Sequence, residues 1–563
     1  MKLNIKVTWP AGLWINSTAD IIIELFAKQG YNVIWDIEYE SIIKWGLTWF
    51  DINISDTTKY IQKASDIIIA FNDKNLENTL SWLKKWGYII VNRKWTEKLS
   101  SKNEGIFDDY NLLDLEINDK YDNTYLLWVM WKLLNIEEQL ILDEVDNVFG
   151  KKSAEISQKN QDVVSNIYKT YELPDWIMNA GMHSLPEIKK VWKKHRVSFW
   201  NSQIAYWAIA SDLWYFAAYP MTPASTVLTE VIKEGSVTFL QPEDELAVMN
   251  SALGASFAWK RAMVGTSGWG FALMVEALSF AVQAEIWVSA VFSQRAGPST
   301  GTPTFTENGD LPFALNCIFG VEQHHIVFSP STLEEWYKFW GLALNLADIY
   351  QCPVIILTDK QFSEWHVTVD EVEPTPVDRW KIENSPSKDY KRYELVDDYI
   401  SPRTFPWQQD WDFITTSYEH DEFWATSEDT EMKKKMTVKR AHKLDNFFAD
   451  QGLSGYEIQN SSAKKMLIVT SFNTYTAQEY IKKNPGYWII IIKFMKPLDE
   501  RLVADLKWVE EIIFVENNYS GQLEKHLTQE LKLDQMDWLK ISNFRKYDLY
   551  PFYMEDYEER FGK

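Results

Sequence analysis

The chain has 563 residues, of which 57 are Lys or Arg and 80 are Asp or Glu, so its formal net charge at pH 7 is -23. This length predicts two to four domains, each large enough to bury a full core. The negative charge argues against nucleic acid and anionic membranes as partners. The longest apolar runs, such as residues 489–492, are too short for a bilayer, and the N-terminus begins a strand rather than a signal peptide, so we expect a cytoplasmic protein.

Only two cysteines are present, Cys317 and Cys352, and they form no Cys-x-x-Cys motif. Such sparse use of cysteine fits a reducing compartment. It also excludes a four-cysteine iron–sulfur cluster or zinc site built from this chain alone. We therefore predict no metal site within the chain.

Tryptophan is unusually frequent and glycine unusually rare: the chain contains 28 Trp and 22 Gly. Several Trp stand at turns where a residue without a Cβ is expected, among them Trp9, Trp14, Trp45, Trp86 and Trp269. We hypothesise that many of these positions are glycine in the organism, encoded by a reassigned UGA codon that is translated here as Trp. The alternative is a core that is unusually rich in Trp.

The N-terminal third begins with a predicted strand at residues 3–8, followed by the turn Trp9-Pro-Ala-Gly-Leu-Trp14 and a helix over residues 16–29. With glycine at positions 9 and 14, this turn would suit a phosphate at a helix N-terminus, although a tight connection without a ligand explains it equally well. Further strands are predicted at 31–37, 64–71 and 87–91, helices at 123–142 and within 145–172, and a linker at 173–197.

The central region alternates regularly between strand-like and helix-like segments. Strands are predicted at 215–219, 237–241, 262–266 and 286–293, and helices at 224–234, 245–259 and 271–285. This alternation predicts a parallel sheet wrapped in helices, whose strands all end at one edge. Thr222, Glu245, Ser267 and Arg295 each follow a different strand, so we expect them to converge there.

Three of these side chains could have a catalytic or binding role, and each also has a purely structural interpretation. Thr222 can cap the helix that Pro223 opens, without excluding a ligand contact. Glu245 begins a largely apolar helix, where burial would raise its pKa and make it a proton donor. The alternative is a solvated Glu in the first turn, favoured by the helix dipole. Arg295 could hold a carboxylate in two hydrogen bonds, or pair with an acidic neighbour at the strand end.

The C-terminal third is less informative about chemistry. Residues 371–460 are rich in charge and proline and are expected to wrap the domains together. From Lys465 the strand–helix alternation resumes, which predicts a small α/β domain with strands at 466–470, 487–494 and 512–515. No acid–base constellation is evident there, so we expect a structural or docking role. The acidic run at 555–559 is predicted to be a solvated tail.

Several motifs together resemble a known family. They are Tyr219-Pro-Met-Thr-Pro-Ala-Ser225, Glu243-Asp-Glu-Leu-Ala247, Thr266-Ser-Gly-Trp-Gly-Phe271, Gln294-Arg-Ala-Gly-Pro-Ser-Thr-Gly301, Glu307-Asn-Gly-Asp310 and Val515-Glu-Asn-Asn-Tyr-Ser-Gly-Gln-Leu523. They resemble the alpha subunit of 2-oxoacid:ferredoxin oxidoreductases, in the subgroup with a gamma domain fused ahead of alpha. The resemblance implies a multidomain α/β fold: a parallel-sheet gamma domain (1–185), a pyrimidine-type thiamine-diphosphate domain (195–370), a connecting segment (371–460) and a transketolase C-terminal-like domain (461–563).

The resemblance also implies an activity and roles for residues. Such enzymes oxidatively decarboxylate a 2-oxoacid on thiamine diphosphate, reduce ferredoxin and transfer the acyl group to coenzyme A. By resemblance, Glu245 hydrogen-bonds the pyrimidine N1′ of the cofactor, and Gly254, nine residues later, supports this register. The implied contacts are, for substrate, Thr222, Arg295 and Thr304; for the cofactor, Ser267 and Gly268; and for coenzyme A, Gly12, Asn16 and Ser17.

What the chain lacks points to a partner. Thiamine enzymes hold the diphosphate through Mg²⁺ bound by a Gly-Asp-Gly motif and a later Asn, and no Gly-Asp-Gly occurs here. The resemblance therefore implies a beta subunit that brings the diphosphate site, Mg²⁺ and a [4Fe-4S] cluster. A fused gamma–alpha chain favours 2-oxoglutarate as substrate, with pyruvate-type or broad specificity as the alternative. Two other functions stay open: a different class of thiamine enzyme and a non-catalytic scaffold. A genuine tryptophan at position 269, beside the site, would favour the scaffold.

Overall fold

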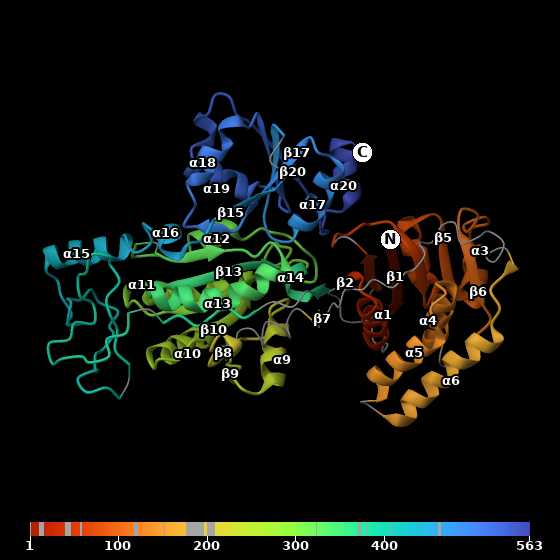
Figure 1. Ribbon diagram of the computed structural model, residues 1–563, viewed down its shortest axis with the longest axis horizontal. Helices are drawn as coiled ribbons and strands as arrows, with labels where there is room; N and C mark the ends of the chain where they lie inside the picture. The colour runs from red at the N-terminus through yellow and green to blue at the C-terminus, as the bar shows by residue number, and fades with distance from the viewer. Residues whose placement is uncertain are drawn as a thin grey trace. The chain divides into compact units, whose positions relative to one another are not determined.

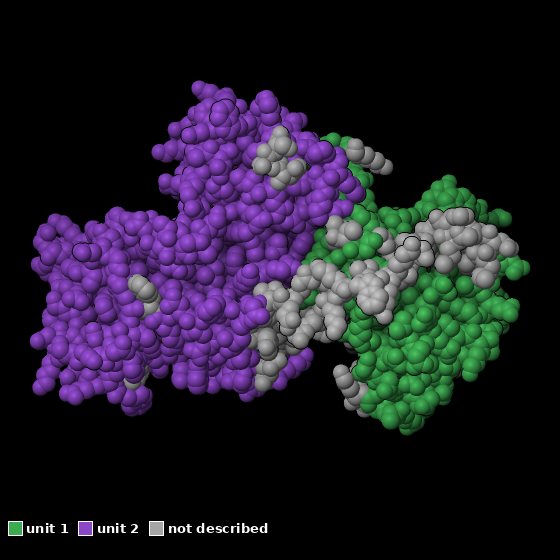
Figure 2. Space-filling view, viewed as in Figure 1, with its two compact units in different colours: residues 1–199, 365–371, 553–563 green, residues 200–364, 372–552 purple. Residues whose placement is uncertain are grey.

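The computed structural model describes residues 2–10, 16–39, 47–56, 59–117, 122–150, 153–175, 196–199, 209–322, 324–369, 373–379, 381–405, 407–459 and 463–562. The chain divides into two compact units (Figure 2). Unit 1 comprises residues 1–199, 365–371 and 553–563, and unit 2 comprises residues 200–364 and 372–552. No helix among the described residues is long and apolar enough to cross a membrane.

Unit 1 is built on an eight-stranded mixed sheet with the order β6-β5-β4-β1-β3-β2-β14-β7 (Figure 1). The strands are β1 (Lys2–Pro10), β2 (Asn32–Tyr39), β3 (Leu47–Ser55), β4 (Ser65–Ala70), β5 (Leu83–Asn92), β6 (Asn111–Leu115), β7 (Arg196–Phe199) and β14 (His366–Val369). Pairing is parallel from β6 to β1 and antiparallel from β1 to β7. The predicted strands correspond to β1, β2, β4 and β5, whereas β3, β6, β7 and β14 were not predicted. The antiparallel pairing was not predicted, because it runs through β3 and β7, which no predicted strand covers, and through β14, which comes from far along the chain.

The helices of unit 1 are α1 (Asn16–Lys28), α2 (Asp73–Thr79), α3 (Arg93–Ser100), α4 (Asp122–Leu133), α5 (Glu138–Val145), α6 (Ala154–Thr170) and α20 (Met554–Phe561). The helix predicted over 123–142 is two helices, because the chain turns at Asn135 with a left-handed φ of 54°. The solvated tail predicted at 555–559 is wrong. Those residues lie in α20, where Tyr557 and Met554 are buried and the Glu555 carboxylate accepts from the backbone of Lys63 and Ala64.

The larger sheet of unit 2 has seven strands in the order β18-β12-β13-β11-β10-β8-β9. They are β8 (Tyr215–Ala217), β9 (Thr238–Leu240), β10 (Ala262–Ser267), β11 (Val288–Gln294), β12 (Ile326–Phe328), β13 (Pro353–Asp359) and β18 (Phe494–Lys496). All pairs are parallel except the one between β12 and β18. Its helices are α9 (Ser225–Glu234), α10 (Glu245–Phe257), α11 (Gly268–Gln283), α12 (Leu311–Leu315), α13 (Leu333–Tyr350) and α14 (Lys360–Glu364). The predicted alternation is confirmed.

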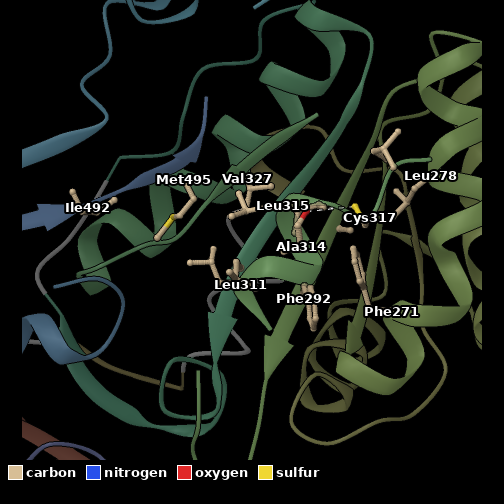
Figure 3. Packing of buried hydrophobic residues seen from close by; sticks show 14 of the residues in the cluster. Phe271, Leu278, Phe292, Leu311, Ala314, Leu315, Cys317, Val327, Ile492 and Met495 are labelled. Carbon is tan, nitrogen blue, oxygen red and sulfur yellow. Dashed lines mark hydrogen bonds between the residues drawn. The ribbon is translucent and has the colours of Figure 1, made fainter. Parts of the chain in front are cut away.

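A second sheet of five strands, β15-β17-β16-β19-β20, completes unit 2 and confirms the alternation predicted after Lys465. Its elements are β15 (Tyr456–Gln459), β16 (Lys465–Val469), α17 (Asn473–Lys483), β17 (Tyr487–Ile492), α18 (Arg501–Asp505), β19 (Glu511–Glu516), α19 (Gln522–Glu530) and β20 (Lys540–Arg545). One hydrophobic cluster includes residues of both sheets. Figure 3 shows Phe292 from β11 and Leu315 from α12 in the same cluster as Ile492 from β17. Because they share a core, the two sheets are held in a fixed relation.

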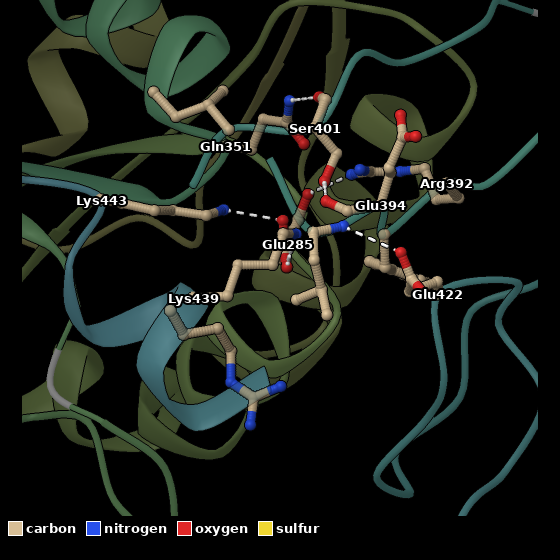
Figure 4. A network of polar contacts seen from close by, with 12 residues as sticks. Glu285, Gln351, Arg392, Glu394, Ser401, Glu422, Lys439 and Lys443 are labelled. Atoms are coloured by element: carbon tan, nitrogen blue, oxygen red, sulfur yellow. Dashed lines mark hydrogen bonds and ion pairs between the residues drawn. The ribbon is translucent and has the colours of Figure 1, made fainter. Parts of the chain in front are cut away.

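The connecting segment carries α15 (Thr430–Ala441) and α16 (Phe447–Gln451) and is fastened through one buried carboxylate (Figure 4). Glu285 is fully buried, and its carboxylate accepts from Lys439 at 2.5 Å and Lys443 at 2.8 Å, while its backbone carbonyl accepts from Arg392. Burial alone would raise the pKa of Glu285, but these cations hold that pKa well below its usual value. The segment is therefore attached by an ion-pair network that is costly to break at either partner.

Among the tryptophans that the structure describes, four have a left-handed backbone: Trp86 (φ 64°), Trp259 (φ 69°), Trp407 (φ 79°) and Trp424 (φ 84°). A bulky residue with positive φ is a genuine outlier, whereas glycine adopts this region readily. Trp407 is also 94% exposed, so its indole gains almost nothing from packing. These backbone angles are what the glycine hypothesis predicts.

Other tryptophans are deeply buried, as the alternative of a Trp-rich core requires; Trp9 packs against Phe50, for example, with ring centroids 4.2 Å apart. However, several buried indole nitrogens have no acceptor among the described residues: those of Trp128, Trp131, Trp287, Trp340 and Trp488. A buried indole N–H normally finds a partner. Trp14 and Trp45 lie outside the described residues, and the identity of the Trp positions stays a prediction.

Candidate active site

The four strands that precede the predicted site residues are neighbours in the order β11-β10-β8-β9, and all pair in parallel. Their carboxyl ends therefore lie along one edge of the sheet, where ligands bind in folds of this kind. Arg295 follows β11, Ser267 ends β10, Thr222 follows β8 and Glu245 follows β9. The predicted convergence of the four residues on one edge is confirmed by this strand order.

Glu245 is the first residue of α10, with Asp244 as its N-cap accepting from the backbone N–H of Ala247 at 2.8 Å. The Glu245 side chain is only 3% exposed, and its Oε1 has no hydrogen-bond partner among the described residues. Burial raises the pKa of this carboxyl, and the neighbouring Asp244 charge raises it further. The interpretation of Glu245 as a solvated first-turn residue is therefore wrong.

The N-terminus of α11 comes very close to this carboxyl. A Cβ built on Gly270 would lie 2.2 Å from Oε1 of Glu245 and 2.4 Å from Oγ1 of Thr266, so a side chain at position 270 would displace both. Ser267 is the N-cap of α11, is fully buried, and its hydroxyl has no hydrogen-bond partner among the described residues. The Glu245 carboxyl and the Ser267 hydroxyl are thus two buried polar groups with unused hydrogen-bonding capacity, each beside the start of α11.

Trp269 lies in the first turn of α11, between Gly268 and Gly270. Its side chain is 57% exposed, so most of the indole faces solvent. Because it is exposed, replacement by glycine would remove little packing from the protein core.

Arg295 and Thr222 are in direct contact: Nη1 of Arg295 donates to the backbone carbonyl of Thr222 at 2.7 Å. The predicted capping by Thr222 is wrong, because a turn at residues 222–224 comes before α9 and Ala224 takes the N-cap position. Since one guanidinium nitrogen binds a neutral carbonyl, the positive charge of Arg295 is not neutralised by that contact. The contact holds the guanidinium at the end of β11, where its other N–H groups can donate to an anion.

Thr304 lies close to Arg295 through a backbone bridge. The N–H of Ala296 donates to the carbonyl of Phe305 at 3.0 Å, and the N–H of Thr302 donates to the carbonyl of Ala296 at 3.3 Å. Thr304 is 4% exposed, and its hydroxyl has no hydrogen-bond partner among the residues that the structure describes. This hydroxyl therefore has hydrogen-bonding capacity left for a bound polar group.

Asp310 belongs to the site, although no role was predicted for it. Its Oδ2 lies 2.9 Å from where a Cβ on Gly268 would be, and its backbone N–H donates to Oε1 of Gln294 at 3.0 Å. Burial and the nearby Glu307 raise the pKa of Asp310 to about 6, while Arg295 acts in the opposite direction. The motif Glu307-Asn-Gly-Asp310 was a signal for this residue, but sequence analysis used it only for the family resemblance.

The residues predicted to contact coenzyme A are in unit 1. Gly12 lies outside the described residues, and Asn16 and Ser17 begin helix α1, with side chains that are likewise outside the description. Their assignment stays a prediction.

Asp310→Asn is expected to stabilise the protein at pH 8 and to leave its stability unchanged near pH 3. The pKa of Asp310 is raised from 3.8 to about 6 on folding, so the folded state binds the proton more tightly. The wild type therefore loses stability between pH 3.8 and pH 6, by at most about 3 kcal/mol, and the Asn variant does not. The difference in urea unfolding between the two proteins as a function of pH measures this effect.

The matched control is Asp537→Asn, which changes an exposed carboxyl. This substitution should show no such dependence on pH. An Asp310→Asn difference that stays constant from pH 4 to pH 8 would contradict the prediction.

Two family models match the chain. The model described as "Pyruvate flavodoxin/ferredoxin oxidoreductase, thiamine diP-bdg" matches residues 207–439. The model described as "Pyruvate ferredoxin/flavodoxin oxidoreductase" matches residues 10–170. The first match contains all the candidate site residues of unit 2 described above.

Curated relatives and a solved structure agree with these matches. The chain is 28% identical to the 2-oxoacid:ferredoxin oxidoreductase subunit alpha of Sulfolobus sp, over 93% of this chain and 91% of the relative. It is 33% identical to the 2-oxoglutarate synthase subunit KorA of Methanocaldococcus jannaschii, over 39% of this chain and 60% of the relative. The fold is similar to that of 2-oxoglutarate:ferredoxin oxidoreductase from Magnetococcus marinus, with TM-score 0.86 and 24% identity over 99% of this chain and 98% of that one. The chain therefore belongs to the family of 2-oxoacid:ferredoxin oxidoreductase alpha subunits.

Proposed function

We propose that this chain is the gamma–alpha subunit of a coenzyme A-acylating 2-oxoacid:ferredoxin oxidoreductase. The reaction is the oxidative decarboxylation of a 2-oxoacid to an acyl-CoA and CO₂, with reduction of ferredoxin. We favour 2-oxoglutarate as the substrate, because the solved structure of similar fold was determined with 2-oxoglutarate, coenzyme A and succinyl-CoA bound. A pyruvate-type substrate is the second candidate, since the descriptions of both family models name pyruvate oxidoreductases.

The buried Glu245 carboxyl is the observation that carries this proposal. Its Oε1 has no partner among the described residues and faces the side-chain-free Gly270, which leaves a buried polar atom with unused hydrogen-bonding capacity. That arrangement fits thiamine diphosphate, since a carboxyl with a raised pKa can share a proton with a ring nitrogen of the aminopyrimidine. Thiamine diphosphate, when bound, supplies the nucleophilic carbon that attacks the keto group of the substrate. Ser267 and Gly268, at the N-terminus of α11, would contact the same cofactor.

The substrate would be held at the end of β11. Arg295 donates one N–H to the Thr222 carbonyl and keeps others for the substrate carboxylate. The Thr222 hydroxyl would contact the keto oxygen. Thr304, with its buried and unpartnered hydroxyl, would contact the side chain of the 2-oxoacid. These groups bind and orient the substrate, so that its keto carbon faces the cofactor.

Other parts of the enzyme would come from a partner. The name "subunit alpha" of the relatives supports a beta subunit, to which we assign the diphosphate site, Mg²⁺ and the [4Fe-4S] cluster that passes electrons to ferredoxin. We propose that this chain consists of a gamma domain (1–185), a pyrimidine-type domain (195–370), a connecting segment (371–460) and a transketolase C-terminal-like domain (461–563). Coenzyme A would bind with help from Gly12, Asn16 and Ser17.

Coexpression of this chain with the neighbouring beta subunit tests the proposal. The purified complex is assayed for coenzyme A-dependent reduction of a viologen dye, with 2-oxoglutarate and with pyruvate. We expect activity that needs thiamine diphosphate, and the substrate with the higher kcat/KM identifies the enzyme. A well-folded complex with bound cluster and no activity on either substrate would contradict the proposed substrates and favour a different 2-oxoacid or a non-catalytic subunit.

Arg295→Lys is expected to raise the KM for the 2-oxoacid by about 10-fold to 100-fold, because Lys keeps the charge but loses the planar fork that binds a carboxylate with two hydrogen bonds. Steady-state kinetics at varied 2-oxoacid concentration measure this change, and the KM for coenzyme A should stay constant. Arg560→Lys, at an exposed position of α20, is the control. An equal rise in both KM values would contradict a specific role in substrate binding.

A further inference from the structure

The C-terminal domain contacts the substrate loop, which we define as residues 304–311. We propose that Asn517, Asn518 and Gln522 are positioning residues that fix this loop, and that the C-terminal domain thereby sets the affinity for the 2-oxoacid. The inference rests on the proposed function for its kinetic consequence. The contacts themselves lie within unit 2 and do not depend on that function.

Five backbone groups of the loop bond to the C-terminal domain. The N–H of Asn308 donates to the carbonyl of Asn517 at 2.8 Å, and the carbonyl of Asn308 accepts from Nδ2 of Asn518 at 3.1 Å. The carbonyl of Gly309 accepts from Nε2 of Gln522 at 2.7 Å, and the N–H of Leu311 donates to Oε1 of the same side chain at 3.2 Å. The N–H of Thr306 donates to the carbonyl of Leu549 at 3.3 Å.

Gln522 therefore spans the turn that carries Asp310. Its amide donates to the residue before Asp310 and accepts from the residue after it, so one side chain binds the backbone on both sides of this carboxyl. A carboxylate or an aliphatic side chain could not make both contacts. This two-sided contact gives a reason for an amide at position 522.

The C-terminal side of these contacts is itself held firmly. Oδ1 of Asn518 accepts from the N–H of Gly521 at 2.7 Å, and its Nδ2 also donates to Glu516 at 3.0 Å. The Glu516 carboxylate in turn accepts from the N–H of Leu523 at 2.7 Å, in the first turn of α19. Because Asn518 is fixed at both ends of its amide, it holds the loop in one position rather than following it.

The other side of the loop contacts the strand end that carries Arg295. Oε1 of Gln294 accepts from the N–H of Asp310 at 3.0 Å, and the Glu307 carboxylate accepts from the N–H of Gly297 at 3.3 Å. The loop is thus bound between β11 and the C-terminal domain. Loss of the C-terminal contacts would let Asp310 and Thr304 move relative to Arg295, which would weaken substrate binding without removing a substrate contact.

Gln522→Ala tests the inference in the complex with the beta subunit. We expect the amide of Leu311 to exchange its hydrogen about tenfold faster and the KM for the 2-oxoacid to rise about tenfold, because two hydrogen bonds to the loop are lost. Gln529→Ala, at an exposed position of the same helix, is the matched control and should change neither quantity. Gln522→Glu keeps an acceptor for Leu311 and should preserve the slow exchange of that amide.

Three results would overturn the inference. The first is faster exchange at Leu311 with an unchanged KM for the 2-oxoacid, and the second is unchanged exchange in Gln522→Ala. The third is a rise in the KM for coenzyme A equal to that for the 2-oxoacid, since a general loss of structure affects both. If the wild-type complex reduced no dye at all, the proposed function would fail, but hydrogen exchange would still report whether Gln522 holds the loop.

Discussion

Glu245→Gln is expected to lower the rate of 2-oxoacid oxidation by about 10²-fold to 10⁴-fold while leaving the complex folded. The Glu245 carboxyl is buried, with an Oε1 that has no partner among the described residues, and its raised pKa suits exchange of a proton with the cofactor ring. A glutamine has nearly the same shape but cannot gain or lose a proton near neutral pH. Viologen reduction under saturating substrate and coenzyme A measures the change in kcat.

The matched control is Glu243→Gln, two residues earlier and exposed. That variant should retain the activity of the wild type, because the register of the thiamine motif selects Glu245. Comparable loss of activity in both variants, or full activity in Glu245→Gln, would show that the carboxyl has been assigned wrongly. Thermal unfolding of each variant separates a loss of chemistry from a loss of fold.

Glycine at Trp86, Trp407 and Trp424 is expected to raise the free energy of unfolding by about 1 kcal/mol at each position. All three residues have positive φ, where an L side chain is strained and glycine is not. Two of the three indoles, at positions 86 and 407, are 54% and 94% exposed, so little packing is lost there. Urea unfolding of the single variants and of the triple variant measures the gain.

Trp508→Gly is the control, because Trp508 is 85% exposed but lies in a helical turn, Leu506–Trp508, and not at a left-handed position. Glycine there should lower stability by up to about 1 kcal/mol. Peptide mass spectrometry of the protein from its own organism tests the cause, since a reassigned UGA codon predicts glycine at 86, 407 and 424. Tryptophan at those three positions would refute the codon hypothesis, whatever the unfolding experiments show.

Much of the fold was readable from the sequence because it depends on local patterns. The alternation around Glu245 and Arg295 predicted a parallel sheet and which residues follow its strands, and each strand and helix of that region is found within a few residues of its predicted bounds. The burial of Glu245 could not be predicted from the local sequence alone, since a Glu at the start of an apolar helix can also be exposed. The family resemblance selected the buried alternative, and the structure confirms it.

What the sequence could not show depends on contacts between distant segments. Asp310 and Gln522 are 212 positions apart in the chain, and only the fold brings Gln522 to the backbone of Gly309 and Leu311. The antiparallel half of the sheet in unit 1 likewise requires β14, from residues 366–369, to pair with β2. Local periodicity carries no information about such pairings, because they are determined by which surfaces remain to be covered once each element has formed. The sequence by itself thus predicted the family, many elements of both units, and the place of Glu245 and Arg295 at one edge of the larger sheet of unit 2, because these follow from local patterns. The tertiary structure alone decided how the loop at residues 304–311 is held, because that depends on contacts between distant segments.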